Sequence, residues 1–374
     1  MSMSKNSEHL VDDLVAKLKR RQLVGSSAVA QATLKLLIVV ISKNNWTTSK
    51  QLLTLVKSVG QRLNLANPTE LAVGNIIRRV LHIIREEFRE AAGHVDSPKD
   101  GSSHQGGGHP HEGTNGLSEF APLTTSSSMY NLLGETGSSS DDDVQYPSSL
   151  RSNIIQEIRE VKDELENIYD NIKNQASLHI HSNEIIMTIG RSKTVEEFLK
   201  MAAMKRKFQV LVAESAPSYS GQEMAVELSK AGIETTVIPD SAVFAVMSRV
   251  NKVILGTHAV LANGGLVAIS GTHMMAAAAK HHSIPVVVCT GLYKLSPLYP
   301  YDEDSFNVTF NPDSVLGFEE GDLIEKVTVT NPYYDYVSPE LVNLFLTNQG
   351  GHPPSYLYRL IVENYDPNDR TFDL

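Results

Sequence analysis

Cysteine is almost absent from this sequence, and so are segments that would direct a chain into a membrane. Cys289 is the single cysteine among 374 residues, so no disulfide can form within the chain, which indicates a reducing compartment. It stands in an apolar run, where a small buried side chain is its expected role. The N-terminal MSMSKNSEHL lacks the apolar core of a signal peptide, and the apolar run 36–41 is too short to span a bilayer. We therefore expect a cytosolic protein that makes no membrane contact.

Positive charge is in deficit, because 33 lysine and arginine residues face 43 acidic residues, for a formal net charge of −10. This balance disfavours direct binding to nucleic acid through its phosphates. No G-x-G-x-x-G follows the first strand of the α/β half, so NAD is not expected either. His104, His109 and His111 lie in a glycine-rich stretch without rigid geometry, which argues against a metal site. We expect no cofactor and no metal, and a partner protein or a small ligand instead.

Helical spacing of apolar residues predicts helices through the first ninety or so residues. The stretch 26–42 is apolar almost all round and should be the central helix of this layer. Thr48 and its neighbours offer an N-cap for the next helix, and Pro68 opens another with a broad apolar face. Four arginines decorate that last helix, at Arg78, Arg79, Arg85 and Arg89. They form either a solvated face or a surface for an acidic or phosphorylated partner.

A glycine- and serine-rich stretch, about residues 94–148, then interrupts the helical pattern. It cannot bury enough apolar surface to order itself and should be a flexible insert. Beyond it, apolar residues return at alternating spacings of four and three, at Ile154, Ile158, Val161, Leu165, Ile168 and Ile172. This seam is too short for an independent coiled coil. We expect it to pack on the first helices and to complete a helical domain over residues 1–179.

Residues 180–374 alternate between strand and helix patterns, and the stretch 236–290 is the clearest part. Short β-branched runs at 236–238, 252–255 and 285–289 enclose segments of helical composition at 241–249 and 273–281. Such alternation predicts a parallel sheet covered by helices. The loop 256–272 leaves the C-terminal end of a strand, where open α/β sheets bind ligands.

In the tail of the chain, the pattern of residues 331–351 predicts a turn and a helix, and a final helix is expected to begin near Pro354. The expected fold class is therefore α/β, an N-terminal α-helical domain followed by a Rossmann-like parallel-sheet domain.

Long runs of the second half resemble a known family, among them AGIETTVIPDSAVFAVMSRVNKVILGTH and TNQGGHPPSYLYRL. They are similar to the alpha, beta and delta regulatory subunits of eukaryotic translation initiation factor 2B, and GGHPPSYLYRL favours the beta members. The resemblance implies a non-catalytic subunit in the regulatory core of a decamer, whose gamma and epsilon subunits perform guanine-nucleotide exchange. It also implies binding to the alpha subunit of initiation factor 2 and sensing of its phosphorylation.

The same fold resembles methylthioribose-1-phosphate isomerases, which leaves a sugar-phosphate isomerase or sugar-phosphate-binding protein as the alternative. Those enzymes need a cysteine and an aspartate as acid and base, and arginines for the phosphate. The matching positions here are Gly190 for the cysteine, His258 for the aspartate, and Ala216 and Ser218 for the two arginines. The resemblance therefore implies a vestigial pocket without isomerase chemistry.

Three further residues complete this expected pocket. Asn263 and Gly264 either form a turn or bind a ligand, and the turn is favoured. Asp240 is expected to cap the following helix. His258 is more plausibly a wall histidine than a ligand contact.

The resemblance also suggests two protein contacts. His181 and Asn183 begin the first α/β strand, at the implied junction with delta, where they either bond across the seam or cap the strand. The helix face around Arg78, Arg79 and Arg85 is the candidate contact for the alpha subunit of initiation factor 2.

Overall fold

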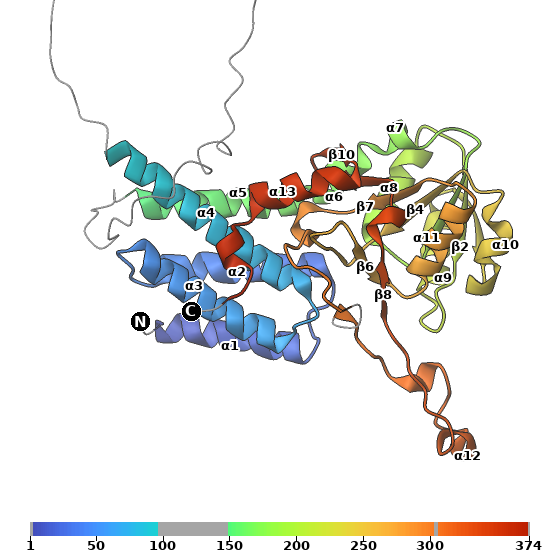
Figure 1. Cartoon of the computed structure of the whole chain (residues 1–374), viewed down its shortest axis with the longest axis horizontal. Helices are drawn as coiled ribbons and strands as arrows, with labels where there is room; N and C mark the ends of the chain where they lie inside the picture. The colour runs from blue at the N-terminus through green and yellow to red at the C-terminus, as the bar shows by residue number, and fades with distance from the viewer. Residues whose placement is uncertain (1–2, 96–148, 303–305, 373–374) are drawn as a thin grey trace, which may run out of the picture.

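A computed structural model describes residues 3–95, 149–302 and 306–372. It contains a layer of long helices beside an α/β domain, and both chain ends lie at the helical layer (Figure 1). The three histidines His104, His109 and His111 and nearly all of the expected insert lie outside the described residues.

Five long helices build the helical domain: α1 Lys5–Lys19, α2 Ser26–Lys43, α3 Ser49–Ala66, α4 Leu71–Val95 and α5 Leu150–Glu166. The central position expected for α2 is confirmed, because it packs against the other four. By length and composition α2 could cross a membrane, yet nine of its residues are buried inside the domain, as in a core helix. The expected N-cap of α3 is confirmed too, since the Thr48 side chain accepts a hydrogen bond from the Gln51 amide.

The seam of α5 packs on the first helices as expected, and the residues that follow it pack on the α/β domain instead. Its apolar residues through Ile168 join the core of the helical domain. Ile172, on the short helix α6 Ile168–Lys173, instead joins the core of the α/β domain, as does Ala176 of α7 Ala176–His179. The two short helices therefore carry the chain from one core into the other.

The α/β domain is built on a seven-stranded sheet in the order β10-β9-β7-β4-β1-β2-β3. All neighbouring strands are parallel except the edge pair β10 and β9. The strands are β1 Ile185–Ile189, β2 Gln209–Ala213, β3 Glu234–Ile238, β4 Lys252–Gly256, β7 Val286–Cys289, β9 Leu344–Thr347 and β10 Gly350–His352. This arrangement confirms the expected fold class.

Alternate residues of the central strands face opposite helix layers, because side chains along a strand point to opposite faces. Val253 and Val288 lie in one apolar cluster, whereas Ile254 and Val287 lie in the other. One face is covered by α8 Lys193–Ala203 and α9 Ser220–Lys230, and the other by α10 Val243–Met247, α11 Thr272–His281 and α13 Leu357–Asn364. Cys289 is fully buried in this core, where burial raises the pKa of its thiol.

Two parts of the sequence-based prediction were wrong or incomplete. The expected helix after residue 337 is instead strand β9, which pairs in parallel with β7 through Val288 and Phe345. The loop 256–272 contains two strands of a small antiparallel sheet that was not predicted. Its members are β5 Ala259–Val260, β6 Leu266–Ile269 and β8 Tyr334–Val337.

Beyond α13 the chain leaves the α/β domain and returns to the helical domain. The short 3-10 helix Pro367–Asp369 leads to Phe372, which is 7% exposed and belongs to the helical core. This C-terminal tail, residues 366–372, ties the end of the second domain to the first (Figure 1).

Candidate functional site

A cavity of about 780 Å³ lies between the two domains, at the C-terminal ends of β1 and β4. The helical domain contributes the α1–α2 loop and the α3–α4 loop. The α/β domain contributes residues after β1 and β4, together with Lys294 and Tyr334. The cavity therefore lies at the end of the sheet where a ligand site was expected.

His258 lines this cavity, and both of its ring nitrogens have partners. Nε2 lies 3.2 Å from the carbonyl oxygen of Thr69. Because a carbonyl oxygen can only accept a hydrogen bond, Nε2 carries the hydrogen and is the donor. Nδ1 then accepts from the hydroxyl of Ser26 at 3.3 Å, and the ring stacks on Tyr334 at 4.6 Å. Burial lowers the pKa of His258, with Lys294 acting in the same direction and Glu70 opposing. His258 is therefore a neutral residue that joins the two domains, as a wall histidine would.

Glu70 and Lys294 are the two further charged groups beside His258, and sequence reasoning missed both. Glu70 Oε1 lies 3.8 Å from His258 Nε2 and has no hydrogen-bond partner among the described residues. Lys294 donates to the Thr257 carbonyl at 2.7 Å. Burial lowers its pKa to about 8, against the attraction of Glu70. A lone lysine in the run GLYKLSP was the signal available in the sequence.

The structure does not bring the seven expected pocket residues together. Gly190 follows β1 with φ of 58°, a backbone conformation that favours glycine, and an added Cβ would come within 3.1 Å of the Ser220 hydroxyl oxygen. The Ser218 hydroxyl donates to the Ser215 carbonyl in the β2–α9 loop. Asp240 does not cap its own helix as expected. Its carboxylate accepts from the Ser215 and Ala216 amides, at 2.9 and 2.7 Å, and fixes that loop.

Asn263 and Gly264 lie elsewhere again, at the tip of the β5–β6 hairpin. The Asn263 side chain accepts from the Gly265 amide at 2.9 Å and donates to the Tyr336 hydroxyl at 2.7 Å. Gly264 has φ of 83° and faces Pro339. The favoured interpretation as a turn is confirmed, because the Gly264 amide donates to the Leu261 carbonyl at 2.8 Å and Gly264 takes the left-handed conformation that closes the loop.

The described lining of the cavity lacks the cysteine and the aspartate that the resemblance to isomerases would require. Proton transfer between neighbouring sugar carbons needs an acid and a base that both reach the substrate. Among the described residues that line the cavity there is no cysteine and no aspartate, and the ring nitrogens of His258 are engaged by Thr69 and Ser26. The arrangement is suited to holding the domains together.

The expected arginine face on α4 is not a free positive surface, and for Arg78 the expectation was wrong. Arg78 is 5% exposed and donates to the carbonyl oxygens of Asp369 and Arg370 at 2.9 to 3.3 Å. Its guanidinium lies 4.5 Å from the ring centroid of Phe372. Burial lowers the pKa of Arg78 to about 10, so it stays charged at neutral pH. Arg79 pairs with Glu164 of α5.

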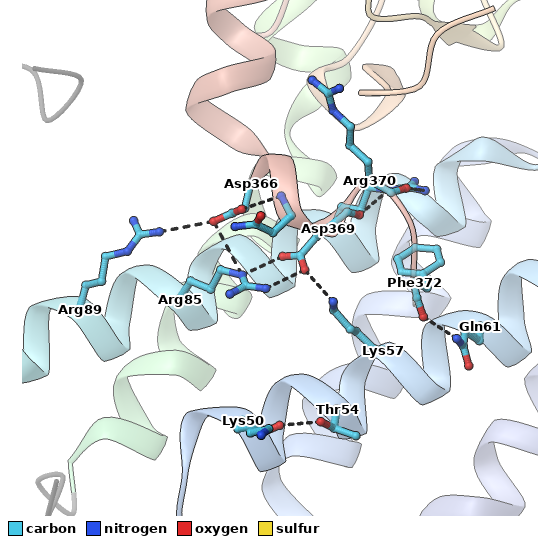
Figure 2. Close-up of polar contacts among 12 residues, drawn as sticks. Lys50, Thr54, Lys57, Gln61, Arg85, Arg89, Asp366, Asp369, Arg370 and Phe372 are labelled. Atoms are coloured by element: carbon cyan, nitrogen blue, oxygen red, sulfur yellow. Dashed lines mark hydrogen bonds and ion pairs between the residues drawn. The ribbon is translucent and has the colours of Figure 1, made fainter. Parts of the chain in front are cut away.

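Arg85 completes a charged clamp on the C-terminal tail (Figure 2). Its Nε and Nη2 donate to the two carboxylate oxygens of Asp369, both at 2.9 Å. Lys57 reaches the same carboxylate at 3.3 Å, and Arg89 approaches Asp366 at 3.4 Å. We call these residues the tail clamp. The sequence placed the arginines on α4 correctly, but nothing in the sequence pairs them with a segment almost 300 residues away.

His181 and Asn183 are exposed at the start of β1. The His181 amide donates to the Glu184 carboxylate at 2.9 Å. Asn183 has φ of 67°, and its amide donates to the Lys207 carbonyl at 2.7 Å. Both backbones shape the start of the strand, and both side chains face solvent in this single chain.

Comparison with known proteins gives consistent matches over nearly the whole chain. The profile of the initiation factor 2 subunit family matches residues 22–354. The chain is 47% identical over 370 residues to translation initiation factor eIF2B subunit beta of Dictyostelium discoideum, covering 96% of this chain and 95% of that protein.

Two solved structures from Chaetomium thermophilum share the fold. The crystal structure of eIF2B beta has a TM-score of 0.69 at 30% identity and covers 98% of this chain and 94% of its own. A chain of the tetrameric eIF2B-beta2-delta2 complex has a TM-score of 0.67 at 29% identity, with coverages of 96% and 95%. These matches agree with the resemblance carried by the sequence motifs. The chain belongs to the initiation factor 2 subunit family.

Proposed function

We propose that this chain is a non-catalytic, beta-type regulatory subunit of the eIF2B guanine-nucleotide exchange complex. The observation that carries the proposal is the 47% identity to an eIF2B beta subunit, which extends over both domains and almost the full length of each protein. Such a subunit would act in the cytosol. It would assemble with alpha, gamma, delta and epsilon subunits and contact the alpha subunit of initiation factor 2.

The cavity supports a role without catalysis of its own. Its histidine is neutral and bonds from the α/β domain to Thr69 and Ser26 of the helical domain, and Lys294 is occupied by a backbone carbonyl. A sugar-phosphate isomerase remains the alternative, because the cavity has room for a small ligand. Turnover of methylthioribose-1-phosphate by the purified chain would favour that alternative.

Contacts with other subunits would use surface that the single chain leaves open. For delta, the proposed contact includes His181 and Asn183, because both side chains are exposed at one end of the sheet. For the alpha subunit of initiation factor 2, the proposed contact is the outer rim of α4. There the Arg89 side chain is 58% exposed, whereas Arg78 is buried.

The proposal is tested by purifying the tagged chain at moderate salt, measuring the native mass, and assaying GDP release from initiation factor 2. We expect a decamer-sized assembly with two copies of this chain and exchange activity. The isolated chain should show no exchange activity. A stable homodimer without partners or exchange activity would overturn the proposal.

A further inference from the structure

The segment between β7 and β8 contains an arm that stands away from both domains. Figure 1 shows the chain leaving the α/β domain, forming the small helix α12 Gly321–Ile324 at the tip, and returning to β8. We define the arm as residues 311–331. Residues 303–305 precede it and are not described.

The two chain segments at the base of the arm are held together by backbone hydrogen bonds and by a pair of stacked rings. The Phe310 amide donates to the Asn331 carbonyl, and the Tyr333 amide to the Val308 carbonyl, both at 2.8 Å. The rings of Phe310 and Tyr333 stack at 4.1 Å, and Arg21 of the helical domain lies 5.4 Å from the Phe310 ring centroid. The arm is therefore mounted on both domains in a defined direction.

The buried Asn331 side chain holds the two ends of the arm together. It is 7% exposed, and its side-chain amide donates to the Asn311 carbonyl at 3.1 Å and to the Ser314 hydroxyl at 3.0 Å. The Asp313 carboxylate accepts from the Phe318 amide at 3.1 Å and shapes the turn before the tip. A segment with this many internal bonds is pre-organised, which lowers the entropy cost of binding.

The arm exposes apolar side chains that nothing in the described chain covers. Phe318 is 59% exposed, Val315 52% and Val327 45%. Single exposed apolar residues are common on protein surfaces, but here three lie within thirteen residues of a projecting segment. Their burial would supply the hydrophobic centre of an interface.

The arm is also strongly acidic. Its five carboxylates are Asp313, Glu319, Glu320, Asp322 and Glu325, against the single base Lys326. All six of these residues are exposed, and no ion pair within the described chain involves any of the five. Complementary charge favours encounter with a basic surface and rejects acidic ones.

We propose that the arm is a docking element that inserts Phe318 and Val315 into an apolar pocket rimmed by lysine and arginine on another subunit of the complex. This inference rests on the proposed function, which supplies such subunits. A second copy of this chain fits the charge poorly, because it has a net charge of −10 and the arms would repel each other. An anionic membrane surface would repel the acidic arm for the same reason.

The proposal is tested in the complex assembled by co-expression of the five subunits. Val315→Ser with Phe318→Ser removes the apolar contacts, and Glu319→Lys with Glu320→Lys reverses the charge. Met204→Ser is the matched control, because Met204 is 77% exposed and lies far along the chain on the α8–β2 turn. We expect each arm variant to weaken the association of this chain at least tenfold in native mass measurements, as loss of a hot spot does.

Two readouts keep the result interpretable. Each full-length arm variant, purified without the other subunits, should have the same midpoint of thermal unfolding as the unmodified chain, because the changed side chains are exposed. A photo-crosslinker placed at Phe318 should attach to a segment of another subunit that is rich in lysine and arginine.

If the arm variants associate as tightly as the unmodified chain, or if the crosslink falls on another copy of this chain or on lipid, the arm proposal is overturned while the regulatory role stands. If the unmodified chain enters no complex, both proposals fail.

Discussion

At the scale of single residues, Asp369 is the clearest example of a side chain whose role depends on the folded structure. Its carboxylate is fully buried and is held by Arg85 and Lys57, whose side chains are 22% and 16% exposed. Breaking a buried pair leaves an uncompensated charge, which costs more than the pair itself contributes.

Asp369→Asn should therefore lower the free energy of unfolding by about 3–5 kcal/mol, measured by urea denaturation. The matched control is Glu340→Gln, because Glu340 pairs with Lys280 at 3.5 Å on the surface, with side chains 69% and 52% exposed. That change should stay within about 0.5 kcal/mol. Equal effects of the two substitutions would contradict the role assigned to the tail clamp.

Asn263→Ala should destabilise the β5–β6 hairpin without removing any binding activity. The change deletes the acceptor for the Gly265 amide and the donor to the Tyr336 hydroxyl. We expect a loss of about 1–3 kcal/mol in the free energy of unfolding. Asn263→Asp keeps the acceptor and should lose less. A well-folded Asn263→Ala variant that selectively lost sugar-phosphate binding would argue for a ligand site here.

At the scale of elements, the sequence predicted most helices and the parallel strands, because their apolar periodicity is local information. It failed at β9, where LVNLFL is short enough to fit either a strand or a helix. What decides between them is the pairing of Phe345 with Val288, which depends on distant residues. The β5–β6 hairpin was missed because its strands are short, although Asn263-Gly264 is a recognised hairpin signal.

The C-terminal tail is the element whose removal should have the widest effect. Deleting residues 366–374 takes Phe372 from the helical core and leaves Arg78 without its carbonyl acceptors and Arg85 without its carboxylate. We expect calorimetry to show two transitions in place of one, with the helical domain unfolding first. Arg370→Ala is the control, because Arg370 binds Arg78 through its main-chain carbonyl. A single unchanged transition after truncation would show that the tail does not couple the domains.

At the scale of the whole molecule, the cavity is where the domains meet, and His258 makes that contact sensitive to pH. Burial lowers the pKa of His258 below its ordinary value of 6.5, although Glu70 opposes this. The unfolded chain then binds a proton more readily than the folded chain, so stability is fully present above pH 6.5 and is lost as the pH falls toward the folded pKa. His258→Gln should flatten the decline in the free energy of unfolding between pH 7 and 5.5. Identical pH profiles for the two proteins would rule out this contribution.

The candidate site was only partly predictable, because the cavity is formed by residues from two domains that are far apart in the sequence. His258 follows a strand, and strand order places it at the edge of the sheet, so the sequence pointed to it. Glu70 and the Ser26 hydroxyl come from the other domain, and no local pattern reveals a contact across 232 residues. Asn263 was grouped with His258 by family motifs, yet the structure places it at the tip of the β5–β6 hairpin. Asp240, expected as a helix cap, instead fixes the β2–α9 loop.

The tail also has a consequence for the order in which the protein can form during synthesis. Domains near the N-terminus generally fold while the rest of the chain is still being made. Here the helical domain is translated first, but its core includes Phe372, which follows the whole α/β domain along the chain. The α/β domain must therefore be synthesised before that core can close. The first domain to be made is therefore the last to be completed, and until Phe372 is in place the apolar side chains of the helical core that it covers would be open to chaperones or to other nascent subunits.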